Sequence, residues 1–398
     1  MFKRRIHVAI DEATWGRRPL PRWARGAPVV QTVDIGRALL MLGSITTPNG
    51  LSPGSPERYW ACIRYFTACA AARDLRIRTP FMELDPHQKG ILSDDFGVAI
   101  STEWLVGKLG GVKEIVDGRR FVINMGVSRT RTGRLPKTGT GKCPDFILED
   151  MQGRFHVLEC KGTQSGRGYL DRAMDTGRQQ KLGVRIAPAI RGERLVIGVA
   201  LAGEGDDAHS QLIVKDPEDE PLTEIREKDV SRANQVLVRL SLARALNLSG
   251  FTQAAFEIAW PEGLDARSPE VELLSAAERK SLSRKVEDRM RGWQEEINTE
   301  FRSAPQRQIG DFIEQEMRFD LPPIELDSGD VATRLKVRRG FRSSVVQDLS
   351  LAGKDLREAA TDKAVKIAAG ENRVSFDETS HSVRLDYGDL FFSEIAFD

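Results

Sequence analysis

Two short apolar runs, separated by six residues rich in charge, constrain the fold of this chain more than any other feature. The runs are residues 145–148 and 155–160. Apolar runs of this length with a glycine-containing turn between them are typical of two neighbouring β-strands. Residues 151–153 can form a three-residue hairpin loop, with Gly153 at the left-handed position that such loops favour. The sequence therefore predicts a β-hairpin here.

The hairpin register decides which charged residues meet. Counting outward from the loop places Asp145 directly opposite Glu159, and directly opposed residues project on one face with Cβ atoms about 5 Å apart. Side chains alternate along a strand, so Glu159 and Lys161 share a face and Cys160 points to the other. We therefore expect Asp145, Glu159 and Lys161 to converge, whereas a slip of one residue would separate them.

This constellation suggests metal chemistry. Two close carboxylates stay ionised together when a cation lies between them, and oxygen ligands suit Mg²⁺ (or Mn²⁺). We expect Asp145 and Glu159 to hold the metal, and the backbone carbonyl of Cys160 to complete its shell while the thiol packs. Lys161 would orient an attacking water or stabilise developing charge. The alternative is a structural hairpin whose charges form a surface salt bridge.

The surrounding pattern predicts further elements in a defined order. Ser93 can cap a helix that ends at Gly110-Gly111. The predicted order is helix, three strands, helix, strand, with the other elements at residues 120–125 (strand), 169–182 (helix) and 195–201 (strand).

Pro144-Asp145, followed after a spacer by Glu159-Cys160-Lys161, resembles the motif of the PD-(D/E)XK nuclease superfamily, which includes restriction endonucleases and Holliday-junction resolvases. The element order is similar to the core of that superfamily. The resemblance implies an α/β, restriction-endonuclease-like core and a Mg²⁺-dependent endonuclease that hydrolyses phosphodiester bonds, with DNA as the expected substrate. A role in restriction or phage defence is an analogy with the family.

The resemblance also suggests two further site residues. Many such families carry an acid on the preceding helix, and Glu103 is the candidate because it borders the apolar face of that helix. Some families place a glutamine on the following helix, where we favour Gln180 over Gln179. The alternatives are a solvated helix acid for Glu103 and a solvated helix end for the glutamines.

A basic loop leads directly into Asp145. Residues 129–142 contain no acid, and such a cationic loop beside a metal site is where a phosphate backbone would be bound. The alternative is a merely solvated loop. The expected nucleic-acid-binding residues are Arg129, Arg131, Arg134, Lys137 and Lys142.

The whole chain divides by pattern into three parts. We predict a mixed α/β N-terminal segment at 1–92, the nuclease-like core at 93–205, and an α+β region for substrate or partner binding at 206–398. Outside the core, the expected elements are a strand at 6–10, helices at about 56–75, 223–247, 269–302 and 355–368, and short C-terminal strands.

Bulk properties are compatible with a soluble protein that has a nucleic-acid partner, but they do not demand one. The net charge is only +1, and the four cysteines match no zinc spacing. No apolar run reaches bilayer length and no secretory signal is recognised, so we expect a cytoplasmic protein with no membrane partner. A homodimer or a partner protein would use the C-terminal region.

Two other classes of function stay open at this point. A nuclease fold can bind nucleic acid or another protein without cleaving, and an unrelated scaffold can carry such a motif by accident. The intact Asp145, Glu159 and Lys161 favour the enzyme over the non-cleaving module.

Overall fold

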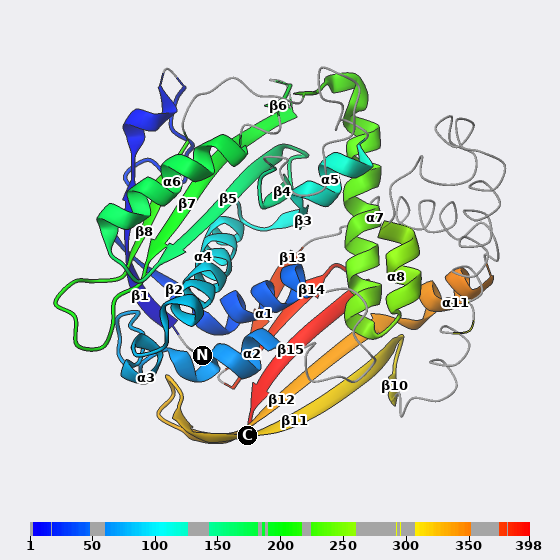
Figure 1. Cartoon of the computed structure of the whole chain (residues 1–398). Helices are drawn as coiled ribbons and strands as arrows, with labels where there is room; N and C mark the ends of the chain where they lie inside the picture. Colours follow the sequence, from blue (N-terminus) through cyan, green and yellow to red (C-terminus); the bar gives the residue numbers. More distant parts are fainter. Residues whose placement is uncertain are drawn as a thin grey trace, which may run out of the picture.

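The computed structural model describes most of the chain (Figure 1). The described residues are 3–16, 18–47, 60–125, 143–181, 185–187, 190–216, 224–259, 292, 295, 307–351, 374–379 and 381–398.

The strands are β1 (Lys3–Ile10), β2 (Val30–Asp34), β3 (Val112–Asp117), β4 (Phe146–Asp150), β5 (Phe155–Thr163), β6 (Arg185–Ile186), β7 (Arg191–Ala200), β8 (Gln211–Lys215), β9 (Glu224–Ile225), β10 (Arg307–Ile309), β11 (Phe312–Glu325), β12 (Val331–Arg342), β13 (Val374–Glu378), β14 (Ser382–Tyr387) and β15 (Phe391–Phe397). A 13-stranded sheet has the order β10-β11-β12-β15-β14-β13-β3-β4-β5-β7-β8-β1-β2, and β6 pairs with β9 in a second, small sheet.

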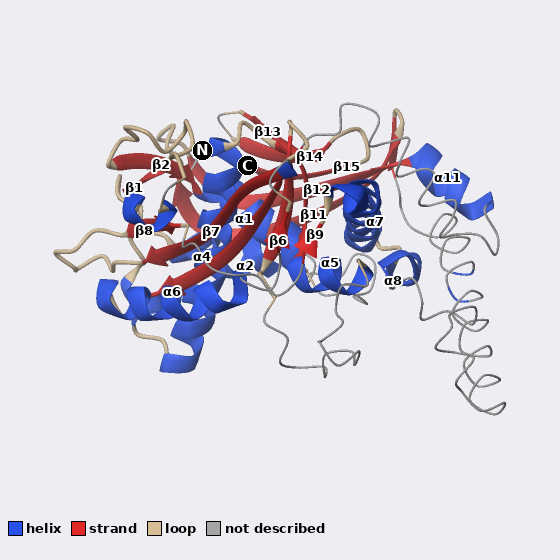
Figure 2. Cartoon of the chain, turned by 90° about the horizontal axis from the view of Figure 1, so that it is seen from above, coloured by secondary structure: helices blue, strands red, loops and turns tan. Residues whose placement is uncertain are grey.

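The α-helices are α1 (Ile35–Thr46), α2 (Trp60–Tyr65), α3 (Thr79–Met82), α4 (Pro86–Lys108), α5 (Gly118–Asn124), α6 (Arg167–Lys181), α7 (Val230–Ser249), α8 (Thr252–Ala259) and α11 (Ser343–Leu351). Short 3₁₀ helices are η1 (Glu12–Trp15), η3 (Phe66–Ala68) and η5 (Glu227–Asp229). Helices and strands occur together along the whole molecule, so the fold is mixed α/β with two sheets (Figure 2).

Four neighbouring strands in the middle of the large sheet position the candidate site. β3, β4 and β5 are successive antiparallel neighbours, and β7 lies parallel to β5. Helices α4 and α6 cover opposite faces: Leu158 of β5 belongs to the same buried cluster as Phe96 of α4, whereas Val196 of β7 packs with Leu170 and Met174 of α6. Along the chain the order is α4, β3, α5, β4, β5, α6, β6, β7, so the expected helix, three strands, helix, strand is present with α5 inserted between the first two strands and the short β6 before the last.

Two glycines allow α4 to lie directly on β5. A Cβ atom at Gly162 would lie 1.7 Å from the carbonyl oxygen of Ser93, and one at Gly97 would lie 2.7 Å from the backbone nitrogen of Gly162. These approaches exclude any larger residue without movement of the backbone. They therefore fix the position of α4 relative to the end of β5.

The first strand of the predicted core was wrongly placed. Residues 120–125 lie mostly in helix α5, and the strand is β3, which precedes it. The side chain of Asp117 accepts a hydrogen bond from the backbone nitrogen of Arg120 at 2.7 Å, which satisfies a donor in the first turn of α5. The β-branched residues Val122 and Ile123 favoured a strand locally, and this capping outweighs them.

Two helix boundaries also differ from the prediction. Helix α4 begins at Pro86, because Asp85 accepts hydrogen bonds from the first backbone N–H groups of that helix. Ser93 lies inside it and donates to the carbonyl of Lys89. The helix predicted to reach Leu75 ends at Tyr65 and continues only as η3, since the backbone of Leu75 instead donates to Arg5 of β1.

The other predicted elements have mixed outcomes. The strands at 6–10 and 195–201 and the helix at 169–182 are confirmed as β1, β7 and α6, with slightly different ends. The helix predicted at 223–247 begins only at Val230. The predicted helices at 269–302 and 355–368 lie outside the described residues, apart from 292 and 295. The C-terminal strands β11 and β12 are long rather than short.

Strands from all three predicted parts of the chain join the large sheet. Helix α7 contacts both β3 and β12, so it connects the central strands with the C-terminal ones. In the described part of the chain, no helix combines the length and hydropathy that crossing a lipid bilayer would require. The four cysteines are free thiols.

Candidate functional site

The hairpin between β4 and β5 has the predicted register. Phe146 pairs with Leu158 and Glu149 with Phe155, and the same register continued by one residue beyond β4 sets Asp145 opposite Glu159. The loop closes with Gly153 in the left-handed region at φ 76°. Because this register places the two acids directly opposite each other, they project on the same face of the sheet.

The three expected side chains meet at this end of the hairpin. The ammonium Nζ of Lys161 donates to Glu159 Oε1 at 2.5 Å, and the backbone nitrogen of Asp145 donates to Glu159 Oε2 at 3.2 Å. Asp145 Oδ2 accepts from the backbone nitrogen of Cys160 at 2.8 Å. Glu159 is fully buried, while the Lys161 side chain is 21% exposed, so the group opens to solvent on the lysine side.

Burial dominates the electrostatics of the two acids. It raises the pKa of Glu159 to about 8, with the Asp145 charge adding to the effect and Lys161 opposing it. Burial also raises the pKa of Asp145, against the Cys160 N–H and Lys161. For Lys161, burial lowers the pKa, but Glu159 and Asp145 outweigh it and the net shift is upward. One ammonium therefore faces two carboxylates, and further positive charge would stabilise the ionised pair.

Two more acids lie near this group. Asp94, an exposed residue of α4, interacts electrostatically with both Lys161 and Asp145. Asp117, at the end of β3, adds to the negative potential at Asp145. Both belong to elements that pack beside the hairpin, and neither was expected from the sequence.

Glu103, the acid expected on the preceding helix, lies beside Asp34, Arg37 and Lys108, and its role at the site stays a prediction. Glu103 lies nine residues beyond Asp94, which is about 13 Å along the helix. Its partners are the backbone N–H of Asp34 and the charges of Arg37 and Lys108. Burial, together with the Asp34 charge, raises its pKa to about 8. The acid of α4 that lies near Asp145 is Asp94, because the glycine contacts place the first half of α4, not the second, on the end of β5.

The remaining expected residues are only partly described. The Cys160 side chain is buried among apolar residues, as predicted, and the role of its carbonyl stays a prediction. Gln180 lies in α6, but its side chain is outside the described residues, as are Arg129, Arg131, Arg134, Lys137 and Lys142.

In the described ranges, no three His, Cys, Asp or Glu side chains lie close enough together to form a complete set of metal ligands. A cation at Asp145 and Glu159 would need water, backbone or substrate oxygens to complete its shell. That is the usual situation for Mg²⁺, which keeps several waters and binds through one or two carboxylates.

A cleft of about 520 Å³ adjoins the site, and Asp145 forms part of its lining. Its walls come from segments far apart in the sequence: the end of α1, the β3–α5 junction, the start of β4, and α7. Arg119, Arg120 and Arg244 line it. Local sequence patterns carry no signal for this arrangement, because α7 reaches the cleft only through the tertiary fold.

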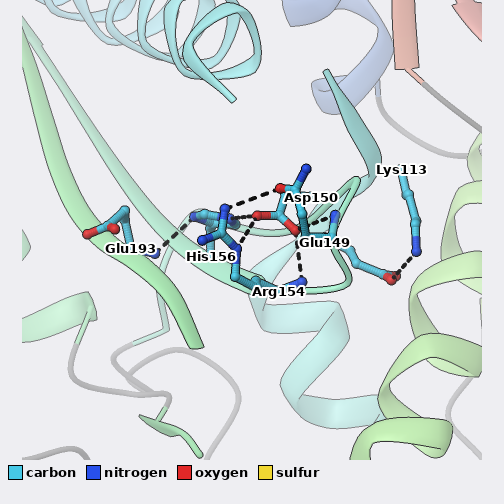
Figure 3. Close-up of polar contacts among 7 residues, drawn as sticks. Lys113, Glu149, Asp150, Arg154, His156 and Glu193 are labelled. Atoms are coloured by element: carbon cyan, nitrogen blue, oxygen red, sulfur yellow. Dashed lines mark hydrogen bonds and ion pairs between the residues drawn. The ribbon is translucent and has the colours of Figure 1, made fainter. Parts of the chain in front are cut away.

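The opposite end of the same hairpin holds a second polar cluster (Figure 3). Asp150 Oδ2 contacts His156 Nε2 at 3.0 Å and Arg154 Nε at 2.7 Å. His156 Nδ1 accepts from the backbone nitrogen of Glu193 at 2.9 Å, so its Nε2 carries the hydrogen that is donated to Asp150. His156 faces away from Glu159, as the strand parity predicts, and both of its ring nitrogens are hydrogen-bonded within this cluster.

Comparisons of the chain with protein-family models, with curated proteins and with solved structures found no match.

Proposed function

We propose that this protein is a metal-dependent nuclease that hydrolyses phosphodiester bonds, with DNA as the substrate. The observation that carries the proposal is the register of the β4–β5 hairpin, which brings Asp145, Glu159 and Lys161 together. The order of elements around the hairpin, and helices α4 and α6 on opposite faces, support a restriction-endonuclease-like core.

Asp145 and Glu159 would hold Mg²⁺. Their oxygens are hard ligands, and the hydrogen bond described for the Asp145 carboxylate uses Oδ2, which leaves Oδ1 for a cation. Two neighbouring carboxylates that share a single ammonium also fit a group that gains a cation. When bound, the ion would polarise the phosphate and lower the pKa of a bound water.

The side chains of the chain would supply positioning and charge. Lys161 reaches the solvent-facing side of the group, where its ammonium can orient the attacking water and stabilise charge on the phosphoryl oxygens. The water oxygen forms the new bond to phosphorus, the bond to the leaving oxygen breaks, and that oxygen takes up a proton. Asp94, which is exposed and interacts electrostatically with Lys161, would accept the proton of the water.

Cleavage of plasmid and single-stranded DNA by the full chain tests the proposal, with Mg²⁺, with Mn²⁺ and with a chelator. Wild type should cut only with a divalent metal. Lys161→Ala should lower the rate at least about 100-fold, because it removes a charge-stabilising donor.

Lys113→Ala is a matched control, since Lys113 also pairs with a glutamate of the hairpin, Glu149, at 3.2 Å. It should cut within about twofold of wild type, because the pair is distant from the candidate site and partly exposed. Equal rates for the two lysine variants would remove the role assigned to Lys161. A wild-type chain that neither binds Mg²⁺ nor cuts DNA or RNA would refute the enzyme.

A further inference from the structure

The cleft beside Asp145 is closed on several sides by described residues. Pro144 and Asp145 form one wall, and Leu240 and Arg244 of α7 form another. The end of α1 and Val98 of α4 also contribute. A space of about 520 Å³ is the size of a small-molecule pocket rather than of the surface that a duplex covers.

The cationic lining of the cleft is suited to phosphate. Arg119 and Arg120 are exposed at the start of α5. Arg244 is held in place: its guanidinium donates to the carbonyl of Ile115 and lies 4.6 Å from the ring centre of Tyr387. A guanidinium whose position is already fixed loses little side-chain entropy when it binds an anion.

The rest of the lining is mixed, because apolar side chains lie beside the polar Ser44, Thr46, Thr47, Asp117 and Asn247. Val98, Val116, Phe146 and Leu240 supply apolar surface within the same cleft. A ligand that matches this lining carries an anion at one end and a flat ring with polar edges at the other. An unpaired nucleotide has this composition, and in a single strand its base is available to pack on protein.

We propose that the cleft binds one unpaired nucleotide of a single DNA strand, with the flanking phosphates on Arg119, Arg120 and Arg244 and the scissile phosphate at Asp145. This inference rests on the proposed nuclease function and narrows its substrate to single-stranded or locally unpaired DNA. A paired base cannot enter a pocket of this size without leaving its stack, whereas a single strand enters without that cost.

Fluorescence anisotropy with the full chain tests the inference. The probes are a short labelled oligothymidylate and a labelled duplex of equal length, with Ca²⁺ in place of Mg²⁺ and at two salt concentrations. Wild type should bind the single strand at least about tenfold more tightly than the duplex, because only the duplex must be opened first.

Arg119→Gln/Arg120→Gln should weaken single-strand binding about tenfold and reduce the salt dependence of log Kd by about 1 to 2. The matched control is Arg318→Gln/Arg334→Gln, whose side chains are 64% and 62% exposed on β11 and β12. The control should change the Kd less than about twofold, since those arginines do not line the cleft. All four positions are exposed, so thermal unfolding should show intact folding.

Equal affinity for duplex and single strand would overturn the inference, as would unchanged binding in the Arg119/Arg120 variant. Metal-dependent cutting of duplex DNA with no preference for single strands would support the nuclease proposal and refute the proposed binding of an unpaired nucleotide. Cleft-dependent binding of the single strand without any cutting in Mg²⁺ or Mn²⁺ would support the cleft and refute the hydrolysis.

Discussion

The two ends of the β4–β5 hairpin each contain a fully buried carboxylate, yet the two are in opposite electrostatic states. Asp150 accepts from two backbone N–H groups, from Arg154 and from His156, and these interactions outweigh burial and lower its pKa to about 2. Glu159 accepts from Lys161 and from one backbone N–H, and its pKa rises to about 8.

The difference shows that burial alone does not decide the state of a carboxylate. Four donors satisfy Asp150, so this end of the hairpin is a closed structural network. Glu159 has fewer donors and a second acid opposite it. A bound cation would therefore stabilise the ionised form of this pair of acids. The first arrangement is typical of structure and the second of a binding site.

The largest expected difference between the two ends is the change in stability when each carboxylate is replaced by its amide. Asp150→Asn places an NH₂ group against the donors of Arg154 and His156, and the bond from Glu193 prevents His156 from reversing its ring hydrogens. We expect a loss of about 3 kcal/mol in the free energy of unfolding. Glu159→Gln keeps an acceptor for Lys161 but turns its NH₂ group toward the backbone N–H of Asp145, so one hydrogen bond is lost and the free energy of unfolding should fall by only about 1 kcal/mol. Urea titration at neutral pH measures both.

For DNA cleavage we expect the opposite result, with the larger loss in Glu159→Gln. Glu159→Gln should abolish metal-dependent cleavage, while the folded fraction of Asp150→Asn should cleave at the wild-type rate. If Glu159→Gln destabilised the chain as much as Asp150→Asn, the proposed contrast between a closed and an open end would be wrong.

The hairpin could be predicted from sequence because its information is local. The left-handed Gly153 sets the loop, the loop sets the register, and the register brings Asp145 opposite Glu159. The other residues near the site depend on contacts between distant segments. Asp94 is placed by the fit of Gly97 against Gly162, and no periodicity in α4 distinguishes Asp94 from Glu103.

The same reason explains the misplaced strand beside the site. The pattern at residues 120–125 favours a strand, but the Asp117 cap and the close fit of Gly118 on Pro144 produce α5 instead. That helix carries Arg119 and Arg120 to the cleft, and Arg244 arrives from α7. A local sequence pattern cannot predict a cleft whose walls come from elements far apart in the sequence.

Glu103 is a partly buried acid with a raised pKa, and it extends the comparison to the pH dependence of stability. Its pKa is about 8 in the folded chain against an ordinary 4.5, so between these values the folded state holds a proton that the unfolded state lacks. Its contribution to stability is therefore present below pH 4.5 and is lost as the pH rises to about 8. Glu103→Gln should leave stability unchanged near pH 5 and raise it by about 1 to 3 kcal/mol above pH 8.

Mg²⁺ then distinguishes Glu103 from Glu159. The ion should raise the melting temperature of wild type and of Glu103→Gln equally, and should not raise that of Glu159→Gln. Loss of the Mg²⁺ effect in Glu103→Gln would mean that Glu103 takes part in metal binding after all. Thermal unfolding across a pH series, with and without Mg²⁺, measures both effects.

The smallest expected effect concerns the space that α6 leaves above the acids. A Cβ atom at Gly177 would lie 2.9 Å from Lys161 Cε and 3.0 Å from Glu159 Cγ, so Gly177→Ala displaces the flexible lysine end. Alanine improves helix propensity by about 1 kcal/mol, so stability should change by less than about 1 kcal/mol in either direction. Cleavage should nevertheless fall by about tenfold or more, because a small misplacement of a charge-stabilising group is costly.

Gly168→Ala in the same helix is the control, since a Cβ atom there meets nothing within 4 Å. Equal cleavage rates for the two variants would show that the open end of the hairpin tolerates a displaced Lys161, and that its position there is not what the chemistry requires.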